Sequence, residues 1–247
     1  MNKLGIFMNF WEKGWAADHK KYIKKAADIG FDILEFQAQP LLEMSDDHIR
    51  ELKKAADDVG IELTYSLGLD RRYDVSSLDE SIRKGGVTYL QNIIRKMEIG
   101  GGTLLSGVSY AGWGTPDDMQ DTKQPYWNQS VKSMREIIKV AEDCGVTYCV
   151  EAVNRFETCL INTAKEALAY IDEIDSKNIG VLLDTYHMNI EEDSIGDAIR
   201  TAGKYLGHFH TGERNRKVPG KGHTPWKEIG EALRDVGYDG HVTMEPF

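Results

Sequence analysis

The sequence predicts one domain, residues 1–247, with the (β/α)8 fold of a TIM barrel. The first observation is an internal repeat: an amphipathic helix, a short turn that usually carries glycine, and a brief β-rich strand, as in YIKKAADIGFDILEF and IIKVAEDCGVTYCVE. This alternation predicts a parallel sheet covered by helices. The second is the count of about eight strands, in a chain whose length suits one barrel. A doubly wound open sheet is the alternative, but no strand is followed by a GxGxxG or GxxxxGK(S/T) loop, and the strand count favours closure.

Each predicted helix is defined by apolar residues at helical spacing, and Gly30 is placed to end the first one. The predicted strands are 4–10, 31–36, 61–66, 103–109, 146–152, 179–184, 205–211 and 240–245. The predicted helices are 17–29, 46–59, 79–98, 127–144, 163–173, 195–203 and 226–236. The chain stops at Phe247, directly after the eighth strand, so we expect the barrel to lack its final helix. A truncation, a misplaced stop and a divergent dimer contact all remain open as reasons.

Composition and charge exclude several classes of protein. The chain has 40 acidic and 30 basic residues and a net charge of −10, which disfavours binding to nucleic acid. No apolar run approaches the ~20 residues that cross a bilayer, and the N-terminus does not read as a signal peptide. The three cysteines fit neither a disulfide framework nor a CxxC motif. We therefore expect a cytoplasmic protein that binds neither nucleic acid nor membranes.

The last four predicted strands each end in a side chain that can bind a metal. These residues are Glu151, Asp184, His210 and Glu245, and the spacings of 33, 26 and 35 residues each correspond to about one βα repeat. Catalytic groups of such barrels lie at the carboxyl ends of the strands, so we expect the four side chains to converge on one rim. Three carboxylates and one imidazole favour Mn²⁺, Mg²⁺ or Co²⁺, and zinc is less favoured without a thiolate.

A second group of candidates follows the same strand ends. Glu157 and His187 would lie in loops above the ligands, where the polar groups of a substrate would be. Arg216 lies in a loop rich in glycine and lysine that is either a solvated surface or a clamp on substrate oxygens. Trp113 is placed to form a pocket wall, whereas His208 is interpreted as a core histidine. Composition favours a surface position for Lys217 and Lys221 and a packing role for Trp226, and it leaves Asn154 and Arg155 undecided.

Four segments carry a close resemblance to the ketose 3-epimerases, the xylose-isomerase-like barrels that include D-tagatose 3-epimerase and D-psicose (D-allulose) 3-epimerase. They are EAVNRFE, LLDTYHMNIEEDSIGDAIRTAG, GHFHTGERNRKVPGKG and VTMEPF. The resemblance covers essentially the whole chain, although GFDILE and GIFMNFWE match more loosely. Family members commonly have tyrosines where this chain has Phe7 and Met8. In the family these residues line the pocket at the far end of the sugar, so the resemblance does not predict which ketose this chain prefers.

The resemblance implies an isomerase that epimerises ketoses at C3 with one divalent metal ion, commonly Mn²⁺. It implies that Glu151, Asp184, His210 and Glu245 bind this ion and that Glu151 and Glu245 are also the acid/base pair. Substrate contacts would come from Glu157, His187, Arg216, Trp113 and Phe7, and the expected assembly is a homodimer or homotetramer.

Such chemistry removes a proton beside the C2 carbonyl and returns one to the opposite face, which requires two carboxylates and a charge that offsets the ene-diolate. Three alternatives keep the barrel: an aldose–ketose isomerase, a phosphoester hydrolase like the endonuclease-IV relatives, and a non-catalytic sugar-binding protein. The acidic, carboxylate-rich character of the chain argues against the hydrolase, and the complete set of candidate ligands argues against the binding protein.

Overall fold

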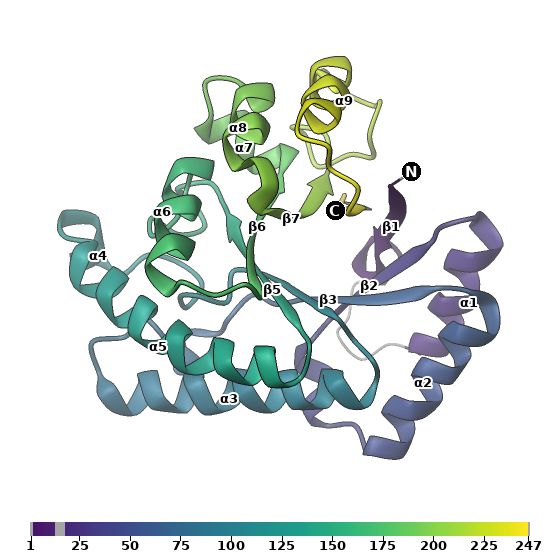
Figure 1. Cartoon of the computed structure of the whole chain (residues 1–247), viewed down its shortest axis with the longest axis horizontal. Helices are drawn as coiled ribbons and strands as arrows, with labels where there is room; N and C mark the ends of the chain where they lie inside the picture. Colours follow the sequence, from purple (N-terminus) through teal and green to yellow (C-terminus); the bar gives the residue numbers. More distant parts are fainter. Residues whose placement is uncertain (1, 13–17, 247) are drawn as a thin grey trace.

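The computed structural model describes residues 2–12 and 18–246. Eight parallel strands follow one another around a closed barrel, and β1 pairs with β8 to complete it (Figure 1). The predicted fold class is therefore confirmed. The strands are β1 (Lys3–Phe7), β2 (Ile33–Gln37), β3 (Glu62–Ser66), β4 (Leu104–Gly107), β5 (Thr147–Ala152), β6 (Ile179–Asp184), β7 (Leu206–Thr211) and β8 (His241–Met244).

Helices connect consecutive strands and cover the outside of the barrel; Figure 1 shows α3 and α5 lying side by side, in agreement with their packing. Every predicted helix has a counterpart. The helices are α1 (His19–Ile29), α2 (Asp46–Val59), α3 (Glu80–Ile99), α4 (Asp117–Asp121), α5 (Gln124–Asp143), α6 (Ala164–Ile174), α7 (Thr185–Glu191), α8 (Ile195–Ala202) and α9 (Trp226–Asp235). The short helices α4 and α7 were not predicted, and Ala17, the predicted start of the first helix, lies outside the described residues. After β8 the structure describes only Glu245 and Pro246, and no helix among them.

The helix ends follow from local chemistry. Ser45 accepts a hydrogen bond from the backbone of His48 at the start of α2, and Gly60 ends the same helix with φ of 73°. The predicted stop at Gly30 is confirmed: this residue has φ of 101°, a conformation that glycine adopts without strain. The other side-chain N-caps among the helices that cover the barrel are Asp18, Asp79, Thr163 and Ser194.

The first predicted strand was too long. The strand ends at Phe7, and Met8–Phe10 form a turn of 3₁₀ helix. Apolar residues continue through this segment, so the sequence pattern alone does not mark the point where the chain leaves the sheet. Helix α5 starts at Gln124, three residues before its predicted start, because Pro125 suits the first turn of a helix.

The side chains facing the barrel lumen are apolar at one level and polar at the next. Leu104, Cys149 and Leu182 form a small buried cluster of their own. Two residues further along β5 and β6, and so on the same face of each strand, lie Glu151 and Asp184. The strand period therefore places polar groups above an apolar plug, at the carboxyl ends of the strands.

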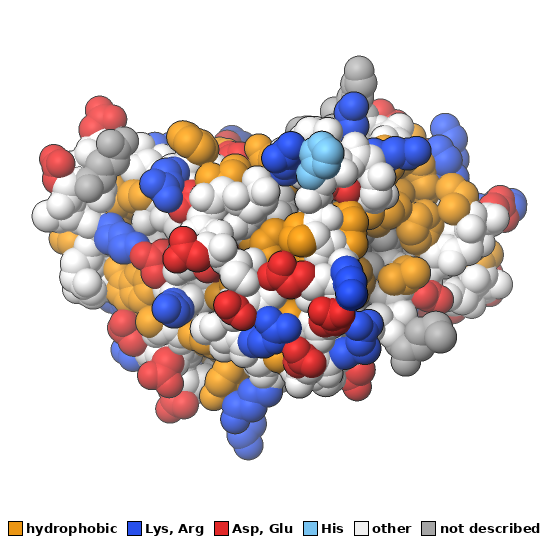
Figure 2. Space-filling view, turned by 90° about the horizontal axis from the view of Figure 1, so that it is seen from above, with side chains coloured by type: hydrophobic (Ala, Val, Ile, Leu, Met, Phe, Trp, Pro, Cys, Tyr) orange, Lys and Arg blue, Asp and Glu red, His pale blue; other side chains and the backbone are white. Residues whose placement is uncertain are grey.

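Acidic and basic side chains are interspersed on the face of the molecule that Figure 2 shows, with hydrophobic side chains between them. The helices that the structure describes include none with both the length and the apolar character needed to cross a bilayer.

Two adjacent glycines in α3 provide a test of the packing between this helix and the preceding loop. A Cβ at Gly86 would lie 2.1 Å from the carbonyl oxygen of Tyr73, whereas a Cβ at Gly85 would meet nothing within 4 Å. We expect Gly86→Ala to lower the free energy of unfolding by about 1–3 kcal/mol through overpacking. The matched control Gly85→Ala should raise it by up to about 1 kcal/mol through helix propensity. Urea denaturation of both variants measures the difference, and equal effects would contradict the packing described here.

Candidate metal centre and substrate cavity

The barrel brings the four predicted metal ligands together at one rim. Glu151 lies near the end of β5, Asp184 ends β6, and His210 pairs in register with Asp184 from β7. Glu245 follows β8, and its backbone N–H donates to the Thr211 carbonyl at 3.0 Å, which continues the pairing of β7 with β8 by one residue. All four candidate ligands are buried.

The donor atoms are close enough to share one ion. Ligand atoms of Glu151, His210 and Glu245 lie within 4.8 Å of one another, and the same holds for Glu151, Asp184 and His187. Glu151 belongs to both groups, so it links Asp184 to the other two candidates. Convergence, which strand spacing predicted, is thus what the structure shows, while the binding of an ion stays a prediction.

Two buried atoms at this cluster have no hydrogen-bond partner among the described residues: Oε1 of Glu151 and Nδ1 of His210. The Glu245 Oε2 atom is 3.5 Å from this histidine nitrogen. Unpartnered buried polar atoms are rare and call for an explanation. A divalent cation bound here would satisfy both of them at once, and a set dominated by hard oxygens suits Mn²⁺, Mg²⁺ or Co²⁺.

His187 presents a ring N–H to the carboxylate cluster. Asp184 caps α7 by accepting from the Tyr186 N–H, and this places His187 in the first turn of the helix. Its Nδ1 accepts the backbone N–H of Asn154 at 3.1 Å, so the neutral ring carries its proton on Nε2. Burial lowers the pKa of His187, which favours this neutral form. The Nε2 atom lies 3.7 Å from Glu151 and 3.8 Å from Asp184, where it presents an N–H rather than a lone pair.

Arg216 reaches into the cluster from the loop after β7. Its Nη1 atom lies 3.0 Å from Oδ2 of Asp184 and 3.3 Å from Oε2 of Glu245. The guanidinium stacks over Tyr186 at 3.9 Å from the ring centroid. The residue has φ of 58°, which is uncommon for a residue other than glycine, so the loop must hold it there. The sequence had left this loop undecided between surface and clamp, and the structure places Arg216 against the carboxylates.

The two carboxylates predicted to act as acid and base differ electrostatically. Burial and the neighbouring carboxylates of Glu245 and Asp184 raise the pKa of Glu151 well above its usual range. Burial acts in the same direction on Glu245, but His210 and Arg216 outweigh it and lower the pKa of that carboxyl. The surroundings therefore shift the pKa values of two residues of the same type in opposite directions within one cluster.

A cavity of about 1520 Å³ opens above the cluster. Its lining includes Glu151, Glu245 and four of the five predicted substrate contacts, which are Trp113, Glu157, His187 and Arg216. The fifth, Phe7, is fully buried and is not part of this lining, so its contact with substrate stays a prediction.

The remaining candidates take structural or surface positions. Lys217 and Lys221 are exposed, as composition favoured. Trp226 begins α9 and packs against the core, as predicted. Asn154 supports His187 through its backbone, and Arg155 pairs with Glu191 at 2.8 Å.

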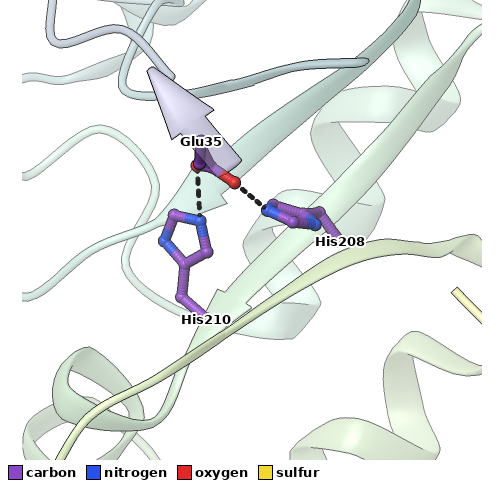
Figure 3. A group of neighbouring side chains, drawn as sticks. All are labelled: Glu35, His208 and His210. Atoms are coloured by element: carbon purple, nitrogen blue, oxygen red, sulfur yellow. Dashed lines mark hydrogen bonds and ion pairs between the residues drawn. The ribbon is translucent and has the colours of Figure 1, made fainter. Parts of the chain in front are cut away.

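Sequence reasoning missed two fully buried glutamates near the site, Glu35 and Glu213. Glu35 lies in β2 and contacts both His208 and His210 (Figure 3). A charged residue inside the apolar run ILEF was the available signal. Glu213 accepts hydrogen bonds from the N–H groups of Gly220 and Thr224 and from the Trp226 indole, at 2.7–3.0 Å. It organises the loop that carries Arg216. Glu213 lies within the segment GHFHTGERNRKVPGKG, but nothing in that pattern distinguishes it from the exposed charged residues beside it.

Comparison with known proteins identifies the family. The model of the xylose isomerase-like TIM barrel family matches residues 23–247. D-psicose 3-epimerase from Ruminiclostridium cellulolyticum is 51% identical over 247 residues, which cover 99% of this chain and 84% of that protein. The chain belongs to the ketose 3-epimerases, within the xylose isomerase-like TIM barrel family. A second relative of the same name, from Agrobacterium fabrum, is 43% identical and covers 99% of this chain and 85% of its own length.

Solved structures of this family agree closely with the fold. The crystal structure of D-psicose 3-epimerase with D-tagatose, from Clostridium cellulolyticum H10, matches with a TM-score of 0.96 at 51% identity, over 99% of this chain and 85% of that one. A structure of L-ribulose 3-epimerase matches with a TM-score of 0.91 at 33% identity, over 100% of this chain and 82% of that one. The resemblance stated from four sequence segments is therefore confirmed.

Metal binding should stabilise the folded chain. A ligand at 100 times its Kd contributes about 2.7 kcal/mol, which for a protein of this size raises Tm by about 5–10 °C. We expect Mn²⁺ added to the EDTA-treated protein to produce this rise, and Asp184→Asn to remove most of it. The exposed Asp193→Asn variant is the matched control. Thermal scans with and without Mn²⁺ measure the increment, and an undiminished rise in Asp184→Asn would argue against a role for Asp184 as a ligand.

The role of Glu213 in holding the loop of Arg216 has a pH signature. Burial opposes ionisation of this carboxyl, but hydrogen bonds from Thr224, Trp226 and Gly220 outweigh it and lower its pKa to about 2. Its contribution to stability is therefore complete above its unfolded pKa of about 4.5 and is lost as the pH falls toward the folded value.

We expect Glu213→Gln to be less stable than wild type by about 1–3 kcal/mol at neutral pH, because one acceptor oxygen is replaced by a donor. The difference in free energy of unfolding between wild type and Glu213→Gln should become smaller as the pH falls from about 6 to about 3.5. Urea denaturation across this range tests the expectation, and a gap that does not change with pH would contradict it.

Proposed function

We propose that this chain is a metal-dependent isomerase that epimerises free ketoses at C3. The observation that carries the proposal is the buried cluster in which Glu151 and Glu245, two carboxylates with oppositely shifted pKa values, share one candidate metal site with His210. Relatives at 40–51% identity over nearly the whole chain are named D-psicose 3-epimerase, and one at 34% is named L-ribulose 3-epimerase, which supports the same reaction.

In this proposal Glu151 and Glu245 exchange the proton at C3. One carboxylate accepts the C3 proton; the C3–H electron pair forms a double bond between C2 and C3, and the π pair of the C2 carbonyl moves onto its oxygen. The other carboxyl group then donates a proton to the opposite face of C3, and the C2 carbonyl forms again. The reverse reaction exchanges the two roles. Because each carboxylate returns to its starting state by exchange with water, hydrogen from the solvent should enter the product at C3.

The proposed metal ligands are Glu151, Asp184, His210 and Glu245, with Mn²⁺ as the ion. The donor set of three carboxylates and one imidazole supports this choice over zinc. When bound, such an ion would offset the negative charge that develops on the substrate oxygens.

Substrate contacts come from the cavity wall. We assign Glu157, His187 and Arg216 to the oxygens at C1–C3 and Trp113 to the apolar wall, because all four line the same cavity as the acid/base pair. His187 is suited to donate from Nε2, as its Nδ1 is already an acceptor. The names of the relatives favour D-fructose and D-psicose as the substrate pair, with D-tagatose/D-sorbose and L-ribulose/L-xylulose as further candidates.

We further propose that residues 1–247 form a single domain, that the chain assembles as a homodimer or homotetramer, and that it is cytoplasmic. The outer surface of β1, where Leu4 is 54% exposed, is available for such a contact. Three free thiols, at Cys144, Cys149 and Cys159, suit a reducing compartment.

Glu151→Gln should abolish entry of deuterium at C3 when D-fructose is incubated with Mn²⁺ and the protein in D₂O, with a loss of at least ~10³-fold relative to wild type. The matched control is the exposed Glu231→Gln variant, which should retain full activity. Proton NMR follows both the exchange and the appearance of the C3 epimer. Substantial turnover in Glu151→Gln would refute the assignment of this residue. An aldose product in wild type would indicate an aldose–ketose isomerase. No product from D-fructose, D-tagatose or L-ribulose in wild type would refute the proposed function.

A further inference from the structure

Behind the candidate metal centre, a carboxylate reaches across the barrel lumen. Glu35 of β2 is fully buried and points toward β7, where its Oε1 lies 2.9 Å from Nε2 of His210 and its Oε2 lies 2.8 Å from Nε2 of His208 (Figure 3). Thr64 of β3 donates its hydroxyl to the same Oε2 at 3.0 Å. Ser106 of β4 donates its hydroxyl to Oε1 at 3.5 Å. Four strands thus meet at one carboxylate, which is not part of the cavity lining.

We propose that Glu35 is the positioning residue of the metal centre: it holds the proton of His210 on Nε2 and so directs Nδ1 of that ring toward Glu151 and Glu245. The inference rests on the proposed metal-dependent function and adds a residue that lies outside its ligand set. A carboxylate only accepts hydrogen bonds, so a histidine nitrogen in contact with it must donate. The nitrogen that remains for a cation is then Nδ1, which has no hydrogen-bond partner among the described residues.

The second histidine explains why this position needs a carboxylate. Both His208 and His210 present Nε2 to Glu35, and each contacts a different oxygen, so both oxygens of this side chain must act as acceptors. Glutamine offers one acceptor and one donor, so one of the two rings would have to turn its lone pair toward the amide. If that ring is His210, its Nδ1 carries the proton and is closed to a metal. His208 and Thr64 also fix the Glu35 carboxylate by binding its other oxygen.

A cation held within the group of Glu35, His208 and His210 is the competing interpretation, since their ligand atoms also lie within 4.8 Å of one another. In that case the Nε2 atoms would bind the cation through their lone pairs. His210 would then carry its proton on Nδ1 and could not contribute to the proposed centre. The two interpretations therefore predict opposite tautomers for one ring.

The test compares Glu35→Gln with Thr64→Val, which removes a hydrogen bond from the same buried carboxylate without touching His210. Isothermal titration of the metal-free proteins with Mn²⁺ should show binding weaker by about 10–100-fold in Glu35→Gln and by less than about 3-fold in Thr64→Val. In wild-type protein loaded with diamagnetic Mg²⁺, ¹⁵N NMR of labelled histidines should show His210 protonated at Nε2. In Glu35→Gln this signature should weaken or be lost.

Equal Mn²⁺ affinity in wild type and Glu35→Gln, with stability lowered as in Thr64→Val, would reduce Glu35 to a structural role and overturn the proposal. Two bound ions per chain, or a His210 proton on Nδ1, would overturn it in favour of the deeper site. If Glu35→Gln does not fold, Glu35→Asp keeps the charge and both acceptors, and its Mn²⁺ affinity should fall by less than about 10-fold; a larger loss would count against the proposal. A wild-type chain that binds Mn²⁺ at this centre without epimerising ketoses would refute the proposed function alone.

Discussion

The candidate metal centre and the layer directly behind it contain four buried carboxylates, and the site depends on how their charge is balanced. They are Glu35, Glu151, Asp184 and Glu245. An unpaired buried carboxylate is strongly destabilising, and several together repel one another. In this structure Arg216 contacts two of them, and the two imidazoles of β7 contact Glu35. At Glu151, by contrast, the buried Oε1 atom has no hydrogen-bond partner among the described residues, so protein groups do not fully offset the cost of burying this carboxyl.

The barrel itself determines which residues meet. Because side chains alternate along a strand, residues two apart share the lumen, and the carboxyl ends of all eight strands open to the same side. His208 and His210 are one such pair: the first contacts Glu35 through Nε2, and the second lies between Glu35 and Glu245. The alternation of side chains along β7 thus places His208, which contacts Glu35, one level below the candidate ligand His210 on the same strand.

The sequence sufficed for the barrel and for the four converging strand ends because both follow from periodicity along the chain. It did not reveal Glu35, since this residue lies within a strand, and its partners are 173 and 175 positions away. Composition left the loop of Arg216 undecided, because its course depends on hydrogen bonds to a single buried carboxylate at Glu213. The segment Thr185–Glu191 gave no sign of a helix, which forms where Asp184 serves as both strand end and N-cap. The spacing of apolar residues along the chain predicts helices and strands, but it does not predict contacts between distant residues or the turns that depend on such contacts.

Two histidines at the candidate centre have the same side chain, yet we propose opposite roles for them, and the difference comes from what the far ring nitrogen contacts. His187 receives a backbone N–H at Nδ1, so its Nε2 carries a proton and can donate toward a substrate oxygen. His210 meets a carboxylate at Nε2, so its Nδ1 is the atom left for a cation. Distances alone would admit both rings as ligands, since each belongs to a cluster of suitable size. The partner of the far nitrogen, rather than proximity to the carboxylates, separates a ligand from a donor.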